Sequence, residues 1–214
     1  MSTATKSGLL VVVVVAGLAA LGGTQLIDTI SGLFGKITGH EPVIIGEGDY
    51  QIMVGGDGQS KIKQCTAQQV LQSRQCEDTK VVVIDAAKMP FIGRNITLAW
   101  ASGQPAVLTR DRPENRRPHY DAVCAPSRFT IQYPSRGSCD EYSFASSTQG
   151  DAGARTEEVP RREQNCQGGT LSRAYQDRPI DIGEEFVVVV ANPQLIADGP
   201  YTGVERARDE SCTA

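Results

Sequence analysis

Two valine-rich runs and one longer apolar run dominate the pattern of hydrophobic and polar residues along this chain. Residues 81–84 are a continuous β-branched run and residues 186–190 are a continuous apolar run, the pattern of strands buried on both faces. Residues 8–21 are apolar throughout. Two polar clusters follow the first strand, at 139–147 and 159–169. The pattern predicts an apolar leader, a buried sheet, and chemistry in the second half of the chain.

The leader is about fourteen residues long, which is shorter than the ~20 residues of a membrane-spanning helix and fits the apolar part of a signal peptide. Five consecutive valines at 11–15 suit a buried core helix poorly. An uncleaved anchor that also takes in residues 24–27 is the alternative, with membrane association through residues 8–21. Both alternatives predict an exported protein: secreted, periplasmic, or membrane-anchored and facing outside.

Several shorter elements follow the leader. Residues 24–63 alternate glycines with short apolar runs, which indicate one or two strands or a flexible linker. Residues 66–75 predict a short helix between two cysteines. Pro90 opens a predicted helix that runs to about Ser102 and ends at Gly103.

A second strand is predicted at residues 106–109. The order strand, helix, strand from residue 81 to residue 109 indicates two neighbouring and parallel strands with the helix packed over them. A further helix is predicted to start at Thr170, with Gly168 and Gly169 allowing close backbone approach. The run at 186–190 is expected to lie at the centre of the sheet.

Composition refines the fold class. The chain has 214 residues, of which 40% are hydrophobic, 6% are aromatic and 22 are glycines. These values predict an α+β fold with a small central β-sheet and short helices packed on it, stapled by disulfides and preceded by the apolar leader or anchor. The predicted division is a signal peptide or anchor at 1–23, a linker or N-terminal extension at 24–77, the main domain at 78–192 and a tail at 193–214.

Six cysteines form an even set without a CxxC pair, and the two histidines are far apart in sequence. This pattern favours disulfides in an oxidising compartment over a zinc site. Six cysteines allow 15 pairings. Joining neighbours in sequence gives the scheme Cys65–Cys76, Cys124–Cys139 and Cys166–Cys212, which attaches the tail to the second polar cluster.

Candidate chemistry lies in carboxylates, amides and arginines. Asp140 and Glu141 are adjacent, so in an extended strand they point to opposite faces and only one of them meets a phosphate. Hard oxygen ligands suit Mg²⁺, and guanidinium groups suit phosphate. The arginines that follow the second strand are the phosphate-binding candidates: Arg110, Arg112, Arg116 and Arg117. The net charge of −4 places any DNA contact on such local clusters.

Four blocks in this order resemble the NucA/NucB deoxyribonuclease family of secreted and sporulation-associated bacterial nucleases. They are residues 103–117, the Asp-Glu-aromatic block at 140–145, the block from Val159 to Gly169, and the closing strand at 186–190. The resemblance covers roughly residues 78–192. Ser143 stands where the family commonly has proline, and Gln104 where it often has histidine.

The resemblance implies metal-dependent hydrolysis of DNA without strict sequence preference. It places Asp140 as the water activator or a metal ligand, with Glu141 behind it or paired with an arginine. Glu163 and Asn165 would help to hold Mg²⁺ or Mn²⁺, and Gln167 would support the substrate. In the structural alternative, Asp140 and Glu141 satisfy arginines or backbone amides, and Glu163 caps the helix that follows it.

Two functional hypotheses follow. The first is an exported metal-dependent endonuclease with DNA as substrate; if it attacked other cells, the producer would need an immunity or inhibitor protein. The second is a non-catalytic, disulfide-stabilised exported domain that binds a protein partner through the same groove. A groove filled by the chain's own tail would favour the second.

Overall fold

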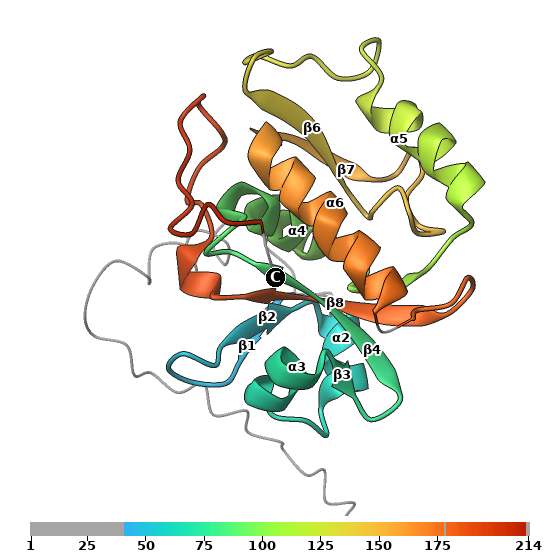
Figure 1. Cartoon of the computed structure of the whole chain (residues 1–214), viewed down its shortest axis with the longest axis vertical. Helices are drawn as coiled ribbons and strands as arrows, with labels where there is room; N and C mark the ends of the chain where they lie inside the picture. The colour runs from blue at the N-terminus through green and yellow to red at the C-terminus, as the bar shows by residue number, and fades with distance from the viewer. Residues whose placement is uncertain (1–40, 178, 213–214) are drawn as a thin grey trace, which may run out of the picture.

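The computed structural model describes residues 41–177 and 179–212, and the fold is a mixed α+β arrangement in layers (Figure 1). The predicted leader at 1–23 lies outside the described residues. A main sheet forms one layer and a two-stranded sheet forms another. Two helices, α4 (Pro90–Ala101) and α6 (Arg161–Gln176), lie between them and contact strands of both. Among the described residues, no helix has the length and apolar character needed to cross a membrane.

The main sheet is built around β8 (Glu185–Ala191), whose residues from Phe186 onward are all buried. On one side β8 pairs in parallel with β4 (Thr79–Asp85), with Val83 opposite Val189. This parallel pair of apolar runs forms the centre of the sheet, as the valine pattern predicts. The predicted central position of the last strand is therefore confirmed.

The other side of β8 is shared by two strands. β2 (Ile52–Val54) pairs antiparallel with its end, and the edge strand β1 (Val43–Ile45) pairs with β2. β5 (Val107–Thr109) pairs antiparallel with its beginning. Strands or a flexible linker were the two alternatives for residues 24–63. The structure shows strands at both apolar runs from residue 43 onward.

The predicted pairing of strands 81–84 and 106–109 is wrong. β8 lies between β4 and β5, and β5 runs antiparallel to β8 while β4 runs parallel to it. The carboxylate of Asp57, in the first turn of α2 (Gly56–Ile62), accepts hydrogen bonds of 3.0 Å from the backbone N–H groups of Ala106 and Val107. This anchor fixes the start of β5 on the far side of β8, a contact that sequence spacing does not reveal.

Helix α3 (Ala67–Ser73) matches the predicted short helix. Thr66 begins it with a capping box, in which its hydroxyl accepts from the N–H of Gln69 and the Gln69 side chain accepts from the N–H of Thr66. A short strand, β3 (Gln75–Cys76), follows at the sheet edge. In Figure 1, α2 and α3 lie on the side of the main sheet away from the two-stranded sheet.

The predicted start of the last helix is wrong. α6 begins at Arg161, directly after β7 (Arg155–Pro160), so the second polar cluster is helical. Pro160, whose ring fixes its φ angle, directly precedes the first turn of α6. The residues of that turn are polar, so a search for apolar residues at helical spacing does not detect it. The predicted close backbone approach at Gly168 and Gly169 is also wrong, because no described atom lies within 4 Å of a Cβ built at either glycine.

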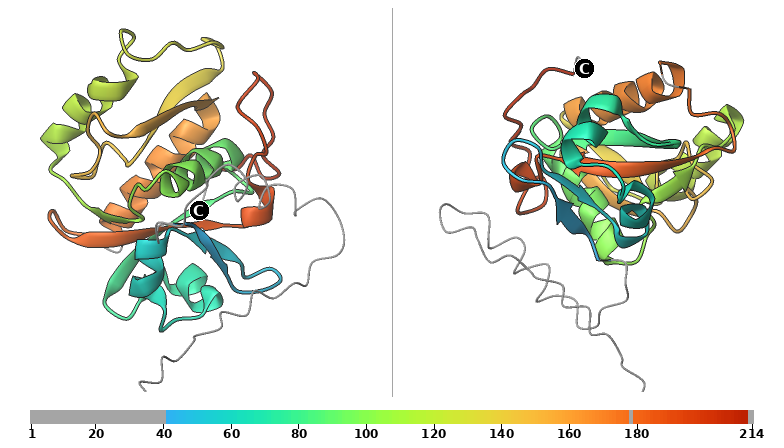
Figure 2. Two further views of the ribbon diagram at one scale, coloured as in Figure 1. Left: turned by 180° about the vertical axis from the view of Figure 1, so that it is seen from behind. Right: turned by 90° about the horizontal axis from the view of Figure 1, so that it is seen from below.

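The remaining elements surround the two-stranded sheet. β6 (Gly137–Tyr142) pairs antiparallel with β7, and α5 (Arg116–Cys124) follows the short helix η1 (Pro113–Asn115). Seen from behind in Figure 2, α5 lies beside β6 and β7. After β8, the short helix η2 (Pro193–Leu195) leads into the tail.

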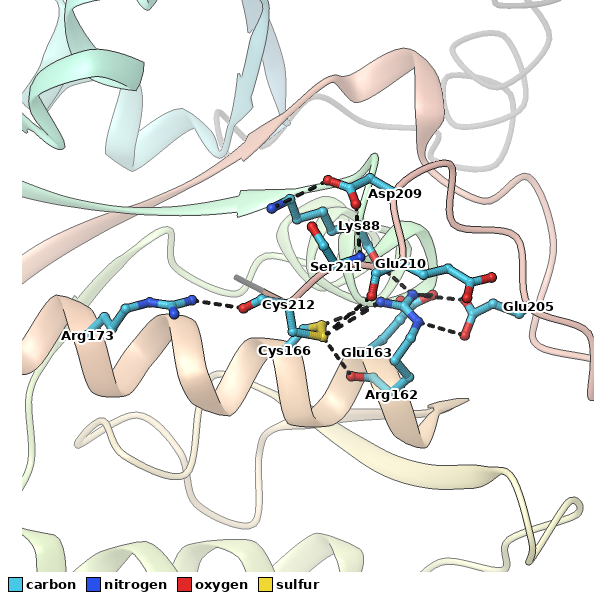
Figure 3. Close-up of a disulfide and its surroundings, with 10 residues drawn as sticks. All are labelled: Lys88, Arg162, Glu163, Cys166, Arg173, Glu205, Asp209, Glu210, Ser211 and Cys212. Atoms are coloured by element: carbon cyan, nitrogen blue, oxygen red, sulfur yellow. Dashed lines mark hydrogen bonds and ion pairs between the residues drawn. A yellow bond between two sulfur atoms is a disulfide. The ribbon is translucent and has the colours of Figure 1, made fainter. Parts of the chain in front are cut away.

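All three predicted disulfides are confirmed. Cys65–Cys76, Cys124–Cys139 and Cys166–Cys212 close loops with sequence separations of 11, 15 and 46 residues. The third attaches the tail to α6 (Figure 3). Arg162 strengthens this attachment, because its guanidinium donates to both carboxylate oxygens of Glu205 at 3.1 and 3.0 Å.

Candidate active site

Strand β6 separates the two adjacent carboxylates. Asp140 stands opposite Glu157 on β7, and Glu141 stands opposite Thr156. Because successive side chains of a strand alternate between faces, Asp140 and Glu141 meet different surroundings. The pair therefore lies in a strand, and only one of its two carboxylates can face the surface of the two-stranded sheet that is open to a ligand.

Glu141 faces a hollow of about 550 Å³ between β6, α5 and α6. From α5 the lining includes Arg116, Arg117 and Tyr120. From α6 it includes Gln164, Asn165, Gln167 and Gly168. The hollow therefore brings together a carboxylate, two cations and several amides. We refer to it below as the Glu141 hollow.

The Glu141 carboxyl is nearly enclosed, with 6% of the residue exposed. Burial raises its pKa to about 7, while the backbone N–H of Ala145, which donates to Oε1 at 3.3 Å, and the charge of Arg116 act in the opposite direction. A carboxyl with such a pKa exchanges its proton near neutral pH, which is the property of a general acid or base.

Asp140 points the other way and is fully buried. Asn95 of α4 donates to its Oδ2 at 2.8 Å, while Oδ1 has no hydrogen-bond partner among the described residues. Burial raises the pKa of Asp140 well above its usual value, and the neighbouring Glu141 raises it further. Asn95 and Gln167 act in the opposite direction. Asp140 thus lies behind the wall of the Glu141 hollow.

Asn95 connects Asp140 to a chain of charges on β7. Its Oδ1 accepts from Arg155, which also donates to Glu157 Oε2 at 2.7 Å. Glu157 in turn pairs with Arg94. The carboxylate of Glu157 is largely buried and is compensated by two guanidinium groups, as a buried charge requires.

Glu163 occupies the first turn of α6 and is completely buried. Its Oε2 accepts hydrogen bonds of 3.0 Å from the backbone N–H groups of Phe91 and Ile92. These groups are among the unpaired donors at the start of α4. Glu163 therefore caps α4, a distant helix, rather than the helix that contains it.

The second oxygen of Glu163 lies on the side of the tail. Figure 3 shows it beside Arg162, whose Nη2 is 3.9 Å from Oε1. Burial raises the pKa of Glu163 to about 9. The side chain is not part of the lining of the Glu141 hollow.

The four predicted phosphate-binding arginines have different surroundings. Arg116 and Arg117 line the hollow, and Arg117 also pairs with Asp121 at 2.6 Å. Arg110 turns inward, where it donates to the carbonyl of Ile180 and lies 4.5 Å from the centre of the Tyr175 ring. Arg112 is exposed at the residue before η1.

The predicted ligand set Asp140, Glu163 and Asn165 is not brought together at the hollow, since only Asn165 lines it. In the described part of the chain, no group of three or more His, Cys, Asp or Glu side chains could hold a metal ion. The hollow does offer one carboxylate and several amide oxygens, and Gln164 Oε1 is buried without a hydrogen-bond partner among these residues. Hard oxygen donors of this kind fit Mg²⁺, which keeps several waters and needs few carboxylates.

Eight lining residues were not among the predicted site residues, and Tyr120 and Gly168 are two of them. Tyr120 was missed because no helix was predicted over residues 116–124, and Gly168 was missed because the start of α6 was misplaced. On α5, Tyr120 stands four residues after Arg116 and therefore on the same helix face. A helix assigned to that segment would have revealed Tyr120.

A carboxylate, arginines and amides around one hollow define a site suited to phosphodiester chemistry. Residues 96–189 match a protein-family model described as Deoxyribonuclease NucA/NucB. The resemblance drawn from the sequence is thereby confirmed over this segment, which is similar to the NucA/NucB deoxyribonucleases. No curated protein matches the chain.

Proposed function

We propose that the chain is an exported, metal-dependent endodeoxyribonuclease that hydrolyses DNA phosphodiester bonds with little sequence specificity. The family match supports DNA hydrolysis. The observation that carries the proposal is the placement of Glu141, the one carboxylate of the Asp-Glu pair that lines a hollow with arginines. Three disulfides support export, because such bonds persist in oxidising compartments.

Glu141 takes the role nearest the reaction in this proposal. Its carboxylate, with the side-chain oxygens of Asn165 and Gln167, would hold Mg²⁺ or Mn²⁺. A bound cation would supply positive charge beside a phosphate oxygen and would lower the pKa of a water. Arg116 and Arg117 bind phosphates of the DNA backbone, which gives affinity without reading sequence.

Asp140 and Glu163 receive supporting roles. Asp140 fixes the wall behind Glu141 through Asn95. Glu163 joins the first turn of α6 to the first turn of α4. It thereby fixes the position of α6, the helix on which Asn165 and Gln167 lie. Asp140 and Glu141 thus exchange the roles that the sequence suggested for them.

The alternative of a non-catalytic binding domain finds no support in the hollow. The tail is attached to α6 through Cys166, and no described tail residue lines the Glu141 hollow. The described part of the tail, up to Cys212, therefore does not fill the groove, and a filled groove is the arrangement that would have favoured a binder.

A plasmid-nicking assay on the oxidised full chain, with Mg²⁺, Mn²⁺ or EDTA, tests the proposal. Nicking is expected with either metal and absent with EDTA. Glu141→Gln is expected to lower the rate at least about a hundredfold, because the amide can neither exchange the proton nor carry the charge. Glu185→Gln is the matched control, since Glu185 is exposed and pairs with Lys61 away from the hollow.

A folded Glu141→Gln variant with full activity would exclude Glu141 from the reaction. Asp140→Asn in the same assay compares the two carboxylates. The amide keeps the shape of Asp140 and its acceptor for Asn95, so this variant is expected to retain more activity than Glu141→Gln. The reverse order would return the reacting role to Asp140.

A further inference from the structure

One aromatic ring in the Glu141 hollow is not needed by the hydrophobic core. Tyr120 lines the hollow on α5 and is partly exposed. It belongs neither to the buried core cluster nor to the partly buried residues packed against that cluster. Phe144 also lines the hollow, but it is 1% exposed and packs within the core. Tyr120 is thus the aromatic lining residue that a ligand can reach.

The surroundings of Tyr120 are cationic. Arg116 and Arg117 line the same hollow, and the guanidinium carbon of Arg117 lies 6.0 Å from the centre of the Tyr120 ring. An aromatic ring beside arginines is the combination with which proteins hold single-stranded nucleic acid: the ring stacks on a base and the cations meet the backbone.

The opposite helix leaves room for such a guest. Gly168 lines the hollow from α6, and a Cβ built there would meet no described atom within 4 Å. The volume of about 550 Å³ is within the range of pockets that enclose small organic ligands. A planar base attached to its phosphate is a guest of the right kind for a ring, two cations and an open helix face.

We infer that Tyr120 is a specificity-determining residue that stacks on an unpaired base, so that the site favours single-stranded DNA over closed duplex. In a duplex each base face is covered by its stacked neighbours, and only a frayed or extruded base can meet the ring. The inference rests on the proposed function and adds to it a preference for unpaired DNA.

Cleavage of two labelled substrates by the oxidised full chain tests the inference. One is a single strand of mixed sequence, and the other is a duplex of the same sequence closed by hairpins at both ends. The wild type is expected to have the higher kcat/KM on the single strand. Tyr120→Leu should lower that value by roughly fivefold or more and should affect the duplex less. Tyr120→Phe should keep the single-strand value, since the ring remains.

Tyr50→Leu serves as the control, because Tyr50 is 45% exposed and lies outside the hollow. Equal losses on both substrates in a folded Tyr120→Leu variant, or no loss on either, would overturn the inference. Measurable and equal wild-type rates on both substrates would overturn it as well.

Binding separates this inference from the proposed function. Fluorescence anisotropy with the labelled single strand in EDTA measures affinity when metal-dependent cleavage is absent. Weaker binding by Tyr120→Leu than by Tyr50→Leu supports stacking even if the wild type cleaves neither substrate, a result that would contradict only the nuclease proposal. Equal binding by the two variants contradicts stacking.

Discussion

Three acidic residues show how differently one chemical group is used in this molecule. Glu141 lines the hollow, Asp140 is held behind its wall by Asn95, and Glu163 caps a distant helix. The sequence shows that adjacent residues of a strand face opposite sides, and this part was predictable. It does not show which side of β6 is covered by α4, because that depends on contacts between residues far apart in the chain.

Removing the carboxyl of Glu163 tests its role as a cap. Glu163→Ala leaves the N–H groups of Phe91 and Ile92 buried without their acceptor, at a cost of about 2 kcal/mol in the free energy of unfolding. Glu163→Gln retains an oxygen acceptor and is expected to fold with nearly wild-type stability at neutral pH. Urea denaturation of the oxidised proteins measures both.

Glu163→Gln also tests whether Glu163 is a metal ligand, as the sequence suggested. Glu163→Gln should keep most of the nicking activity, since the side chain does not line the hollow. A variant as stable as the wild type but inactive would show that the carboxylate takes part in the reaction.

Glu163 also gives stability a dependence on pH. In the unfolded chain it ionises near its usual pKa of 4.5, whereas burial raises the folded pKa to about 9. Between these values the folded chain holds a proton that the unfolded chain has lost, so the free energy of unfolding falls as the pH rises. The stabilisation is complete below the lower value and is lost as the pH passes the upper one.

Urea denaturation from about pH 5 to about pH 9 should therefore show a decline that is shallower in Glu163→Gln. Glu141, whose folded pKa is raised to about 7, adds to the lower part of the same decline in both proteins. Parallel curves for the wild type and Glu163→Gln would contradict a buried, protonated Glu163.

At the scale of elements, local signals predicted α3, α4, β4, β5 and β8, whereas α5, β6, β7 and the pairing between distant strands escaped prediction. Pro90 and Gly103 bracket α4 as expected, and Gly103 has a φ of 93°, which glycine adopts without strain. The two valine runs form the central pair of strands. The position of β5 depends on the bond from Asp57, 49 residues away from Ala106, and no local pattern encodes it.

Two neighbouring glycines of α6 offer a matched test of the hollow. Neither Gly168 nor Gly169 has a described atom near its missing Cβ, so alanine at either position should stabilise the helix by about 0.5–1 kcal/mol. Only Gly168 lines the hollow. Gly168→Ala should therefore lower the nicking rate while Gly169→Ala leaves it unchanged.

Thermal unfolding and the nicking assay on the same preparations measure the two effects. Equal activity in both alanine variants would mean that the substrate does not approach this face of α6.

At the scale of the whole molecule, the tail and α6 are held together by one covalent bond. Cys166–Cys212 closes a loop with a sequence separation of 46 residues, and removing such a cross-link costs about 4 kcal/mol on the chain-entropy model. The double variant Cys166→Ser/Cys212→Ser should unfold at a correspondingly lower urea concentration.

The loss should reach the site as well, because Cys166 lies between Asn165 and Gln167 on α6. Nicking activity of the double variant is therefore expected to fall more steeply on warming than that of the wild type. Unchanged unfolding in urea would show that non-covalent contacts hold the tail in place, among them the Arg162–Glu205 pair and the Lys88–Asp209 pair.

We propose that the folding unit extends on both sides of the segment that identifies the family. The family match begins at Ile96, inside α4, and ends at Val189, inside β8. β8 is flanked by β4 on one side and by β2 on the other, and both strands precede residue 96.

A fragment cut to the recognised segment would expose both long edges of its central strand except where β5 covers one of them. The segment that defines the family is therefore shorter than the segment that is needed for folding. A fragment made for study needs at least the strands from residue 43 onward and the tail through Cys212.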